Sequence, residues 1–276
     1  MNDLTHILDD LIDHITVLKE LGERSVEMDP QVVRDLNSMR KPLPQSVVAV
    51  GTAPAKKRAR KKREPLTKAV LQNSQPMARA ERIQALRELE HELSHCFDCD
   101  LCKTRAKPIA GQGNPDNPDI MFIGPAPDAA DERSGRVFSG PAGDLLTKMI
   151  EAMEYKREDL FLTNICKCRP ENDRAPLLKE MKACTHFLEE QIRIVRPKVI
   201  VVLGEHAIRG LFLNQSRSTS PQGAWTQYHG LPVMPTFHPK YILRFQNDSA
   251  GQQRQLKSSV WRALKAVMQL IKKNRP

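Results

Sequence analysis

The sequence contains little that would place it in a membrane or outside the cell. No apolar run approaches the ~20 residues that a membrane-spanning helix needs. The N-terminal stretch "MNDLTHILDDLIDHI" is acidic and has neither the basic segment nor the cleavage site of a secretory signal. We therefore expect a cytoplasmic protein without membrane contact. Cysteines are also few, six in 276 residues, and because disulfides are rare in the cytoplasm we interpret them as metal ligands or core residues.

Aromatic residues are scarce as well, with two Trp, three Tyr and eight Phe, so an aromatic side chain in a polar loop is a functional candidate. Charge, in contrast, is abundant and unbalanced: 43 Lys and Arg against 33 Asp and Glu give a formal net charge of +10. This excess favours an acidic partner such as nucleic acid. Seven of the nine residues from Lys56 to Glu64 are Lys or Arg, which fits a solvated tether, a contact with phosphates or a nuclear address.

Two segments precede the main domain. Apolar residues recur at three- and four-residue steps from Leu4 to Leu21, which predicts an amphipathic helix over about residues 3–22. This helix could self-associate, dock on the rest of the chain or bind another protein. Proline, small residues and the basic run then indicate a linker. We expect an N-terminal helical extension at 1–40, a basic Pro-rich linker at 41–77 and one domain at 78–276.

The domain alternates short apolar strands with helices. Strands are expected at 119–124, 160–165, 199–204 and 231–237, and helices at 78–95, 143–153, 177–195, 205–213 and 258–273. This order predicts an α/β fold, a three-layer α/β/α domain around a central, mostly parallel four-stranded sheet, with the helical and disordered N-terminal extension outside it. Sites collect at the carboxyl ends of parallel strands. The polar segments "GPAPDAADE", "TNICKCRP", "GEHA" and "FHPKY" each follow a strand.

Half of the cysteines stand in one short run, "CFDCDLC", at residues 96–102. The run begins like a bacterial ferredoxin motif, but Ala106 occupies the fourth position of that motif, so the ferredoxin interpretation fails. The remaining three are Cys166, Cys168 and Cys184. Four thiolates from both groups could hold zinc or an iron–sulfur cluster. Cys166, on a predicted strand, is interpreted as a core residue.

Five blocks of the sequence, "CFDCDL", "GQGNPDNPDIMFIG", "GRVFSGPAGDLL", "LTNICKCRP" and "FHPKYILR", resemble the iron–sulfur uracil-DNA glycosylases of family 4. The similarity runs from about Cys96 to Arg244, with the blocks in the same order. It implies an enzyme of base-excision repair that hydrolyses the N-glycosidic bond of uracil in single- or double-stranded DNA. It also implies a structural 4Fe–4S cluster that leaves out Cys102 and Cys166. The implied ligands are Cys96, Cys99, Cys168 and Cys184.

The resemblance also assigns the active site. Removing a base requires an enzyme to flip it from the stack, recognise it, stabilise the departing anion and place a water. Asp131 and His238 are the implied catalytic residues, for the water and for the base oxygen that gains charge. An Asn amide can pair with uracil O4 and N3–H, a pattern that cytosine does not match. The expected substrate contacts are Pro125, Ala126, Pro127, Phe138 (stacking), Asn164 (recognition) and His238.

The first of these motifs departs from the family pattern G-E-x-P-G-x-x-E-D. Pro125 replaces the first Glu, and Asp128 replaces a Gly. We expect a monomeric enzyme that retains activity through Asp131. The alternative is a non-catalytic Fe–S nucleic-acid-binding module of the same fold, and a zinc-binding structural domain is a third possibility. The basic residues around the predicted cluster could contact phosphates or form surface salt bridges, and these are Arg105, Lys167 and Arg169.

Overall fold

The computed structural model describes residues 65–73, 75, 77–213, 222–245 and 251–274. All of them belong to one compact unit, Glu64–Pro276. The predicted helix at 3–22 and the basic run lie outside the described residues. The described part begins inside the predicted linker, where Leu66 is buried in the core. None of the described helices is long and apolar enough to cross a membrane.

A six-stranded sheet forms the centre of the domain, in the order β1-β3-β2-β4-β6-β5. The four inner strands are mutually parallel and match the four predicted ones: β2 (Ile120–Gly124), β3 (Phe161–Asn164), β4 (Val199–Leu203) and β6 (Leu231–Thr236). Three of them, β2, β3 and β4, are buried along their full length, as continuous apolar runs predict. Two short antiparallel edge strands, β1 (Gln112–Gly113) and β5 (Thr226–Tyr228), were not predicted.

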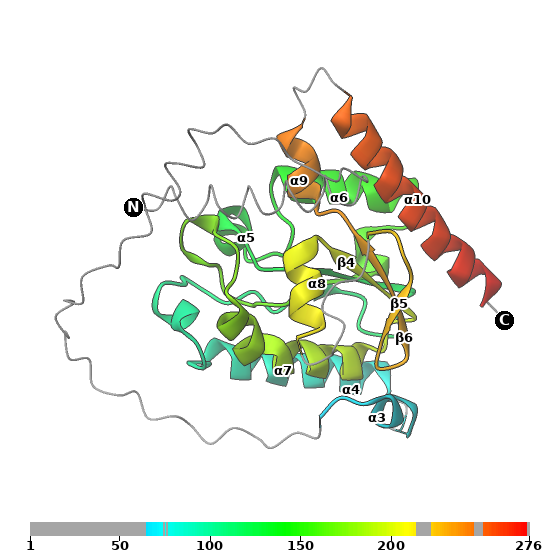
Figure 1. The fold of residues 1–276 in the computed structure, drawn as a ribbon. Coiled ribbons are helices and arrows are strands. Elements are labelled where there is room, and N and C mark those ends of the chain that lie inside the picture. The colour runs from blue at the N-terminus through cyan, green and yellow to red at the C-terminus, as the bar shows by residue number, and fades with distance from the viewer. Residues whose placement is uncertain (1–64, 74, 76, 214–221, 246–250, 275–276) are drawn as a thin grey trace, which may run out of the picture. The chain divides into compact units, whose positions relative to one another are not determined.

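Helices cover both faces of the sheet and complete the predicted three layers (Figure 1). Side chains alternate along β2, so that Met121 and Ile123 join one core cluster and Ile120 and Phe122 join the other. The first cluster lies under α4 (Arg79–Ser94), α7 (Leu178–Val195) and α8 (Glu205–Leu211). The second lies under α6 (Pro141–Ala152), α9 (Pro239–Arg244) and α10 (Gln252–Lys273). The short helices α3 (Lys68–Asn73) and α5 (Ala129–Ser134) complete the set, with three 3₁₀ turns, η1 (Asp100–Lys103), η2 (Arg157–Asp159) and η3 (Glu171–Asp173).

The strand order places a switch point beside β2. From β2 the chain first moves to β3 on one side and later to β4 and β6 on the other. Loops that leave neighbouring strands in opposite directions open a crevice at their carboxyl ends, which is where ligands bind in such sheets. The predicted site residues of the three strand-end segments after β2, β3 and β6 therefore meet at one edge of the sheet.

Candidate active site and cysteine cluster

Asn164 ends β3 with its side chain fully buried. Neither the oxygen nor the nitrogen of its amide has a hydrogen-bond partner in the protein. Such a group is rare, because a buried polar atom without a partner costs ~1–3 kcal/mol. Opposite it in the sheet register stands Gly124, where a Cβ would overlap the Asn164 oxygen and would lie 2.8 Å from Cζ of Phe138. Glycine at this position therefore keeps open the space between the amide and the Phe138 ring.

Phe138 lies in the loop between α5 and α6 and has a positive φ of 52°, which is unfavourable for a bulky residue. Arg157 holds this loop in place. Its guanidinium donates to the carbonyl of Val137 (2.9 Å) and the hydroxyl of Thr147 (3.0 Å), and more weakly to the Phe138 carbonyl (3.4 Å). The Phe138 ring is nearly buried and faces the ring of His238, with centroids 6.1 Å apart.

His238 follows β6 and caps α9. Its Nδ1 accepts the backbone N–H of Lys240 at 3.0 Å, so the proton of the neutral ring is on Nε2. Burial is the main cause that lowers the pKa of His238 to about 3, and the charge of Lys240 adds to it. The ring is therefore a neutral donor at working pH. Gly204 at the end of β4 admits this residue, because a Cβ there would lie 3.0 Å from that of His238.

Asp131 lies in the first turn of α5, which Asp128 caps by accepting the N–H groups of Ala130 (2.8 Å) and Asp131 (3.0 Å). The Asp131 carboxylate is buried and accepts the N–H of Ser139, next to Phe138, at 2.6 Å. Burial raises the pKa of Asp131 to about 6, against the lowering effect of the Ser139 N–H. At neutral pH the group is thus an ionised acceptor that titrates close to the working range, as suits a water-positioning role.

The segment that departs from the family pattern forms the turn from β2 to α5. Pro125 accepts the N–H of Cys166 at 3.0 Å through its backbone oxygen, and Pro127 is buried while Ala126 is half-buried. The segment is therefore fixed at the carboxyl end of β2 beside β3. Asp128 uses its carboxylate as a helix cap, which leaves Asp131 as the buried carboxylate of this motif.

The four predicted ligands gather where η1, the loop after β3 and α7 meet. Cys96 and Cys99 pack against the core cluster that contains Cys168 and Cys184. The thiol of Cys99 interacts electrostatically with that of Cys168, and each of these two thiols interacts with that of Cys184. Two N–H donors point at the sulfurs, one from the guanidinium of Arg105 to Cys168 Sγ (3.1 Å) and one from the backbone of Lys167 to Cys184 Sγ (3.3 Å). Soft donors with N–H groups directed at sulfur fit an iron–sulfur cluster.

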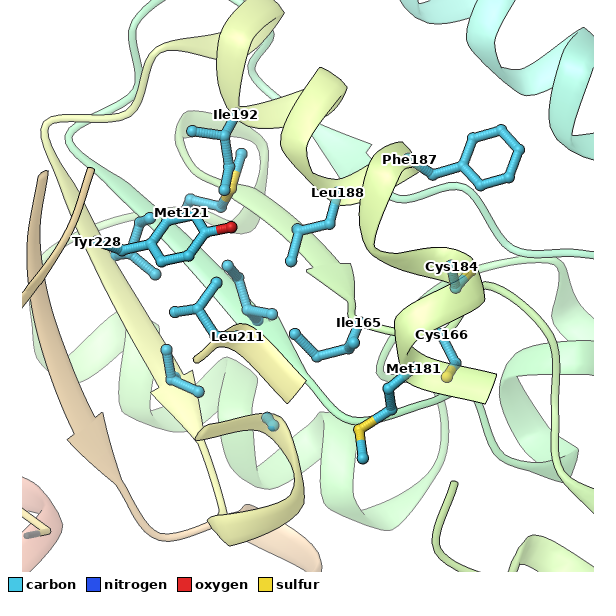
Figure 2. Close-up of a cluster of buried hydrophobic side chains, with 14 of the residues drawn as sticks. Met121, Ile165, Cys166, Met181, Cys184, Phe187, Leu188, Ile192, Leu211 and Tyr228 are labelled. Atoms are coloured by element: carbon cyan, nitrogen blue, oxygen red, sulfur yellow. The ribbon is translucent and has the colours of Figure 1, made fainter. Parts of the chain in front are cut away.

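The other two cysteines are close to the same place. Cys166 is fully buried, as predicted, and its side chain lies beside that of Cys184 on α7 (Figure 2). Cys102 donates its backbone N–H to Cys99 and interacts with the Cys168 thiol. Among the described residues no group of three or more Cys, His, Asp or Glu side chains could hold a metal ion as arranged. A cluster is larger than one ion, so its ligands stand further apart.

The basic residues around the cysteines have roles that differ from one another. Lys167 is fully buried, with its ammonium bonded inside the protein, so a phosphate contact by Lys167 is wrong. Arg169 pairs with Asp173 (2.6 Å) and Glu132 (3.5 Å), which agrees with the salt-bridge interpretation. Arg105 bonds the Cys96 carbonyl (2.8 Å) as well as Cys168, and so ties together two cysteine-bearing segments.

Three residues of the site were not found from the sequence. Gly124 closes an apolar strand, and glycine there looks like a simple turn residue. Arg157 and Lys167 stand in charged or cysteine-rich stretches that resemble solvated surface. Val137 for Arg157 and Gln191 for Lys167 are 20 and 24 residues away in the sequence, so no local pattern reveals these bonds.

Comparisons with known proteins identify the family of the chain. A family model described as the uracil DNA glycosylase superfamily matches residues 110–265. A type-4 uracil-DNA glycosylase of Sulfurisphaera tokodaii is 38% identical over 170 residues, which cover 58% of this chain and 77% of the relative. One of Thermotoga maritima is 37% identical over 169 residues, 60% of this chain and 88% of the relative. One of Saccharolobus solfataricus is 39% identical over 161 residues, which cover 55% of this chain and 74% of the relative. The chain thus belongs to the uracil-DNA glycosylase superfamily and, within it, to the type-4 enzymes.

Proposed function

We propose that this protein removes uracil from DNA by hydrolysing the N-glycosidic bond of a base flipped into the site between Phe138, Asn164 and His238. The observation that carries the proposal is the buried, unpartnered amide of Asn164. A folded protein tolerates such a group where a ligand supplies the missing bonds. Uracil supplies a complementary pair, because its O4 accepts and its N3–H donates.

Base recognition follows from three groups. The Asn164 amide donates to O4 and accepts from N3–H, whereas cytosine presents a donor and an acceptor in the opposite places and would leave both amide atoms unpaired. The nearly buried Phe138 ring supplies a stacking face on the same space. The segment Pro125–Pro127, fixed by its bond to Cys166, lines the entry and offers backbone groups to the base.

Bond cleavage places positive charge on the sugar and negative charge on the base. His238, neutral and with its proton on Nε2, donates to the uracil oxygen that gains charge; a preorganised donor of this kind contributes roughly 10²–10³-fold in rate. Asp131, ionised near neutral pH, holds the attacking water and can accept its proton. These two roles need one group neutral and the other charged at the same pH. The lowered pKa of His238 keeps the ring neutral, and the pKa of Asp131, although raised to about 6, still leaves the carboxyl mostly ionised at neutral pH.

A 4Fe–4S cluster would be held by Cys96, Cys99, Cys168 and Cys184. When bound, the cluster supplies a covalent tie between the η1 segment, the loop after β3 and α7, and it takes no part in the hydrolysis. The chain's own residues add to that tie, since Arg105 bonds both Cys96 and Cys168. We further propose a DNA-bound monomer in the cytoplasm, with the helix predicted from the sequence at 3–22 as a site for a protein partner.

The proposal is tested by an excision assay on single-stranded and double-stranded DNA that contains one uracil, with iron content measured on the same sample. We expect strand breaks at the uracil after alkaline treatment, and none at cytosine. Absence of excision at high enzyme concentration with full iron occupancy would favour the non-catalytic binding module, which Pro125 in the first motif keeps as the second candidate.

A further inference from the structure

Lys167 is a buried cation at the centre of a polar network. Its side chain is fully buried. The ammonium donates to three oxygens, which are the carbonyl of Asn164 (2.6 Å), the hydroxyl of Thr163 (2.7 Å) and the side-chain oxygen of Gln191 (2.6 Å). These three bonds use all three hydrogens of the ammonium. A buried ammonium is costly unless its bonds are complete, so the geometry of this network is strongly determined.

The network is anchored to two further elements. Gln191, on α7, donates its amide N–H to the carbonyl of Ala110, and the Thr163 hydroxyl lies 3.0 Å from the same carbonyl. The backbone of Lys167 closes the loop, because its carbonyl accepts the N–H of Ile109 at 2.7 Å. The end of β3 is thus held from one side by α7 and by the strand-like segment at 109–110.

The direction of the Asn164 amide depends on how the backbone of this residue is held. Its side-chain amide has no partner in the protein, so no hydrogen bond of its own fixes the direction of the amide. Gly124–Asn164 is the last register pair between β2 and β3, and two main-chain bonds follow it, from Ile165 to Gly124 (2.8 Å) and from Cys166 to Pro125 (3.0 Å). The peptide group that follows Asn164 is held from two sides: its N–H, from Ile165, donates to the Gly124 carbonyl (2.8 Å), and its carbonyl accepts from the Lys167 ammonium (2.6 Å). Lys167 therefore supplies the side-chain part of the anchor for the residue that carries the amide.

We propose that Lys167 is a positioning residue for base recognition: through the Asn164 carbonyl it holds the Asn164 amide at the angle that pairs with uracil. The inference rests on the proposed function and deepens it. In this role Lys167 touches neither the base nor the reacting atoms. Its effect is entirely through Asn164, and that dependence distinguishes it from a buried cation that merely stabilises the fold.

The domain contains such a cation for comparison. Arg82 on α4 is as buried as Lys167 and donates to the carbonyls of Ile194 and Val195 at the end of α7. Its Nε donates to the Met77 carbonyl (3.0 Å) and lies 3.6 Å from the Asp116 carboxylate, so none of these bonds reaches the strand ends that carry the site. Arg82→Met is therefore a matched control, since it removes a buried charge and its bonds to main-chain carbonyls without touching Asn164.

The test is a double-mutant cycle. We would compare Lys167→Met in the wild-type and the Asn164→Ala backgrounds, with single-turnover excision on uracil-containing DNA, and would measure affinity for free uracil and for DNA and the iron content of each sample. Misplacement by ~1 Å costs about 100-fold. We therefore expect Lys167→Met to lower kcat/KM by about 10–100-fold and to weaken free-uracil binding, while DNA affinity and iron content stay unchanged. In the Asn164→Ala background the same substitution should lower kcat/KM by less than about threefold, since the two residues act as one unit.

Other results would refute either the role of Lys167 or the proposed function. The same loss in both backgrounds, or an equal loss from Arg82→Met, would refute the positioning role. If Lys167→Met loses iron, Gln191→Leu is used in its place. We expect Gln191→Leu to lower kcat/KM by a smaller factor, and to have no further effect in the Asn164→Ala background. A loss of kcat/KM that persists in that background refutes the proposal. A wild-type chain that excises no uracil refutes the proposed function itself, whereas an active wild type with additive variants refutes only the role of Lys167.

Discussion

Replacing Asp131 by Asn should abolish most of the activity and yet make the protein more stable. The pKa of this buried carboxyl is raised from 3.8 to about 6. The native state therefore holds the proton more tightly than the unfolded chain does, and ionisation costs the native state free energy. The cost grows as pH rises from about 4 to 6 and is complete above 6, where the difference between the two pKa values corresponds to about 3 kcal/mol.

Asn keeps the shape and can still accept the N–H of Ser139, which bonds the carboxylate at 2.6 Å. The bond becomes weaker without the charge, by about 1 kcal/mol. The net gain at pH 7.5 is then about 2 kcal/mol, or a rise in Tm of roughly 4–8 °C for a domain of this size. At pH 5.0 the native carboxyl of the wild type is mostly protonated, its cost is about half as large, and the gain should fall below about 1 kcal/mol.

The assay is unfolding followed by circular dichroism at pH 7.5 and 5.0, with excision measured in parallel. Loss of the water-positioning carboxylate should lower turnover by roughly 10²–10⁴-fold, and in the wild type excision should decline as pH falls through about 6. Asp128→Asn is the control, because Asn caps a helix as well as Asp does. The reasoning fails if Asp131→Asn is less stable than the wild type at pH 7.5, or if its advantage does not depend on pH.

The remaining predictions concern the base contact, the space around it and the cluster. His238→Ala should lower turnover by about 10²–10³-fold with DNA affinity nearly unchanged; a parallel loss of binding would show that the ring holds DNA instead. Gly124→Ala should lower excision at least ~100-fold, because the methyl group enters the space between Asn164 and Phe138, and full activity would place the base elsewhere. Cys184→Ser should lower iron content and visible absorbance, whereas Cys102→Ser should keep about four irons per chain; iron loss in the second variant would contradict the ligand assignment.

The parts of the fold that the sequence predicts well are those with continuous apolar runs. The four parallel strands lie within two residues of the predicted bounds, because strands buried on both faces appear in the sequence as short continuous apolar runs. Helix α7 also lies within two residues of its predicted bounds, although its sequence mixes apolar and charged residues. The edge strand β1, with two residues, is too short to produce a pattern. Helix α10 begins at Gln252 instead of residue 258 because its first turns are polar.

Some features of the site could likewise be predicted from the sequence, and others could not. Asn164, His238 and Phe138 stand in recognisable motifs at strand ends or in a polar loop, and the structure brings all three to one edge of the sheet. The sequence gives no sign that Asn164 lacks a partner, because an unsatisfied group is defined by every atom around it. Lys167 was misjudged for the same reason: a lysine between two cysteines resembles surface charge until Gln191 on a later helix is seen to bond it.

The unpartnered amide of Asn164 and the ionised carboxyl of Asp131 also bear on the history of the chain. Each lowers the stability of the domain, by an amount that a single change to an apolar or neutral residue would recover. Most substitutions lower the stability of a protein, and substitutions that raise it again are favoured where they do not impair function. A descendant that only bound DNA would have had two such substitutions available at the centre of its core. This chain carries both costly residues, which argues for the chemistry of base removal despite Pro125.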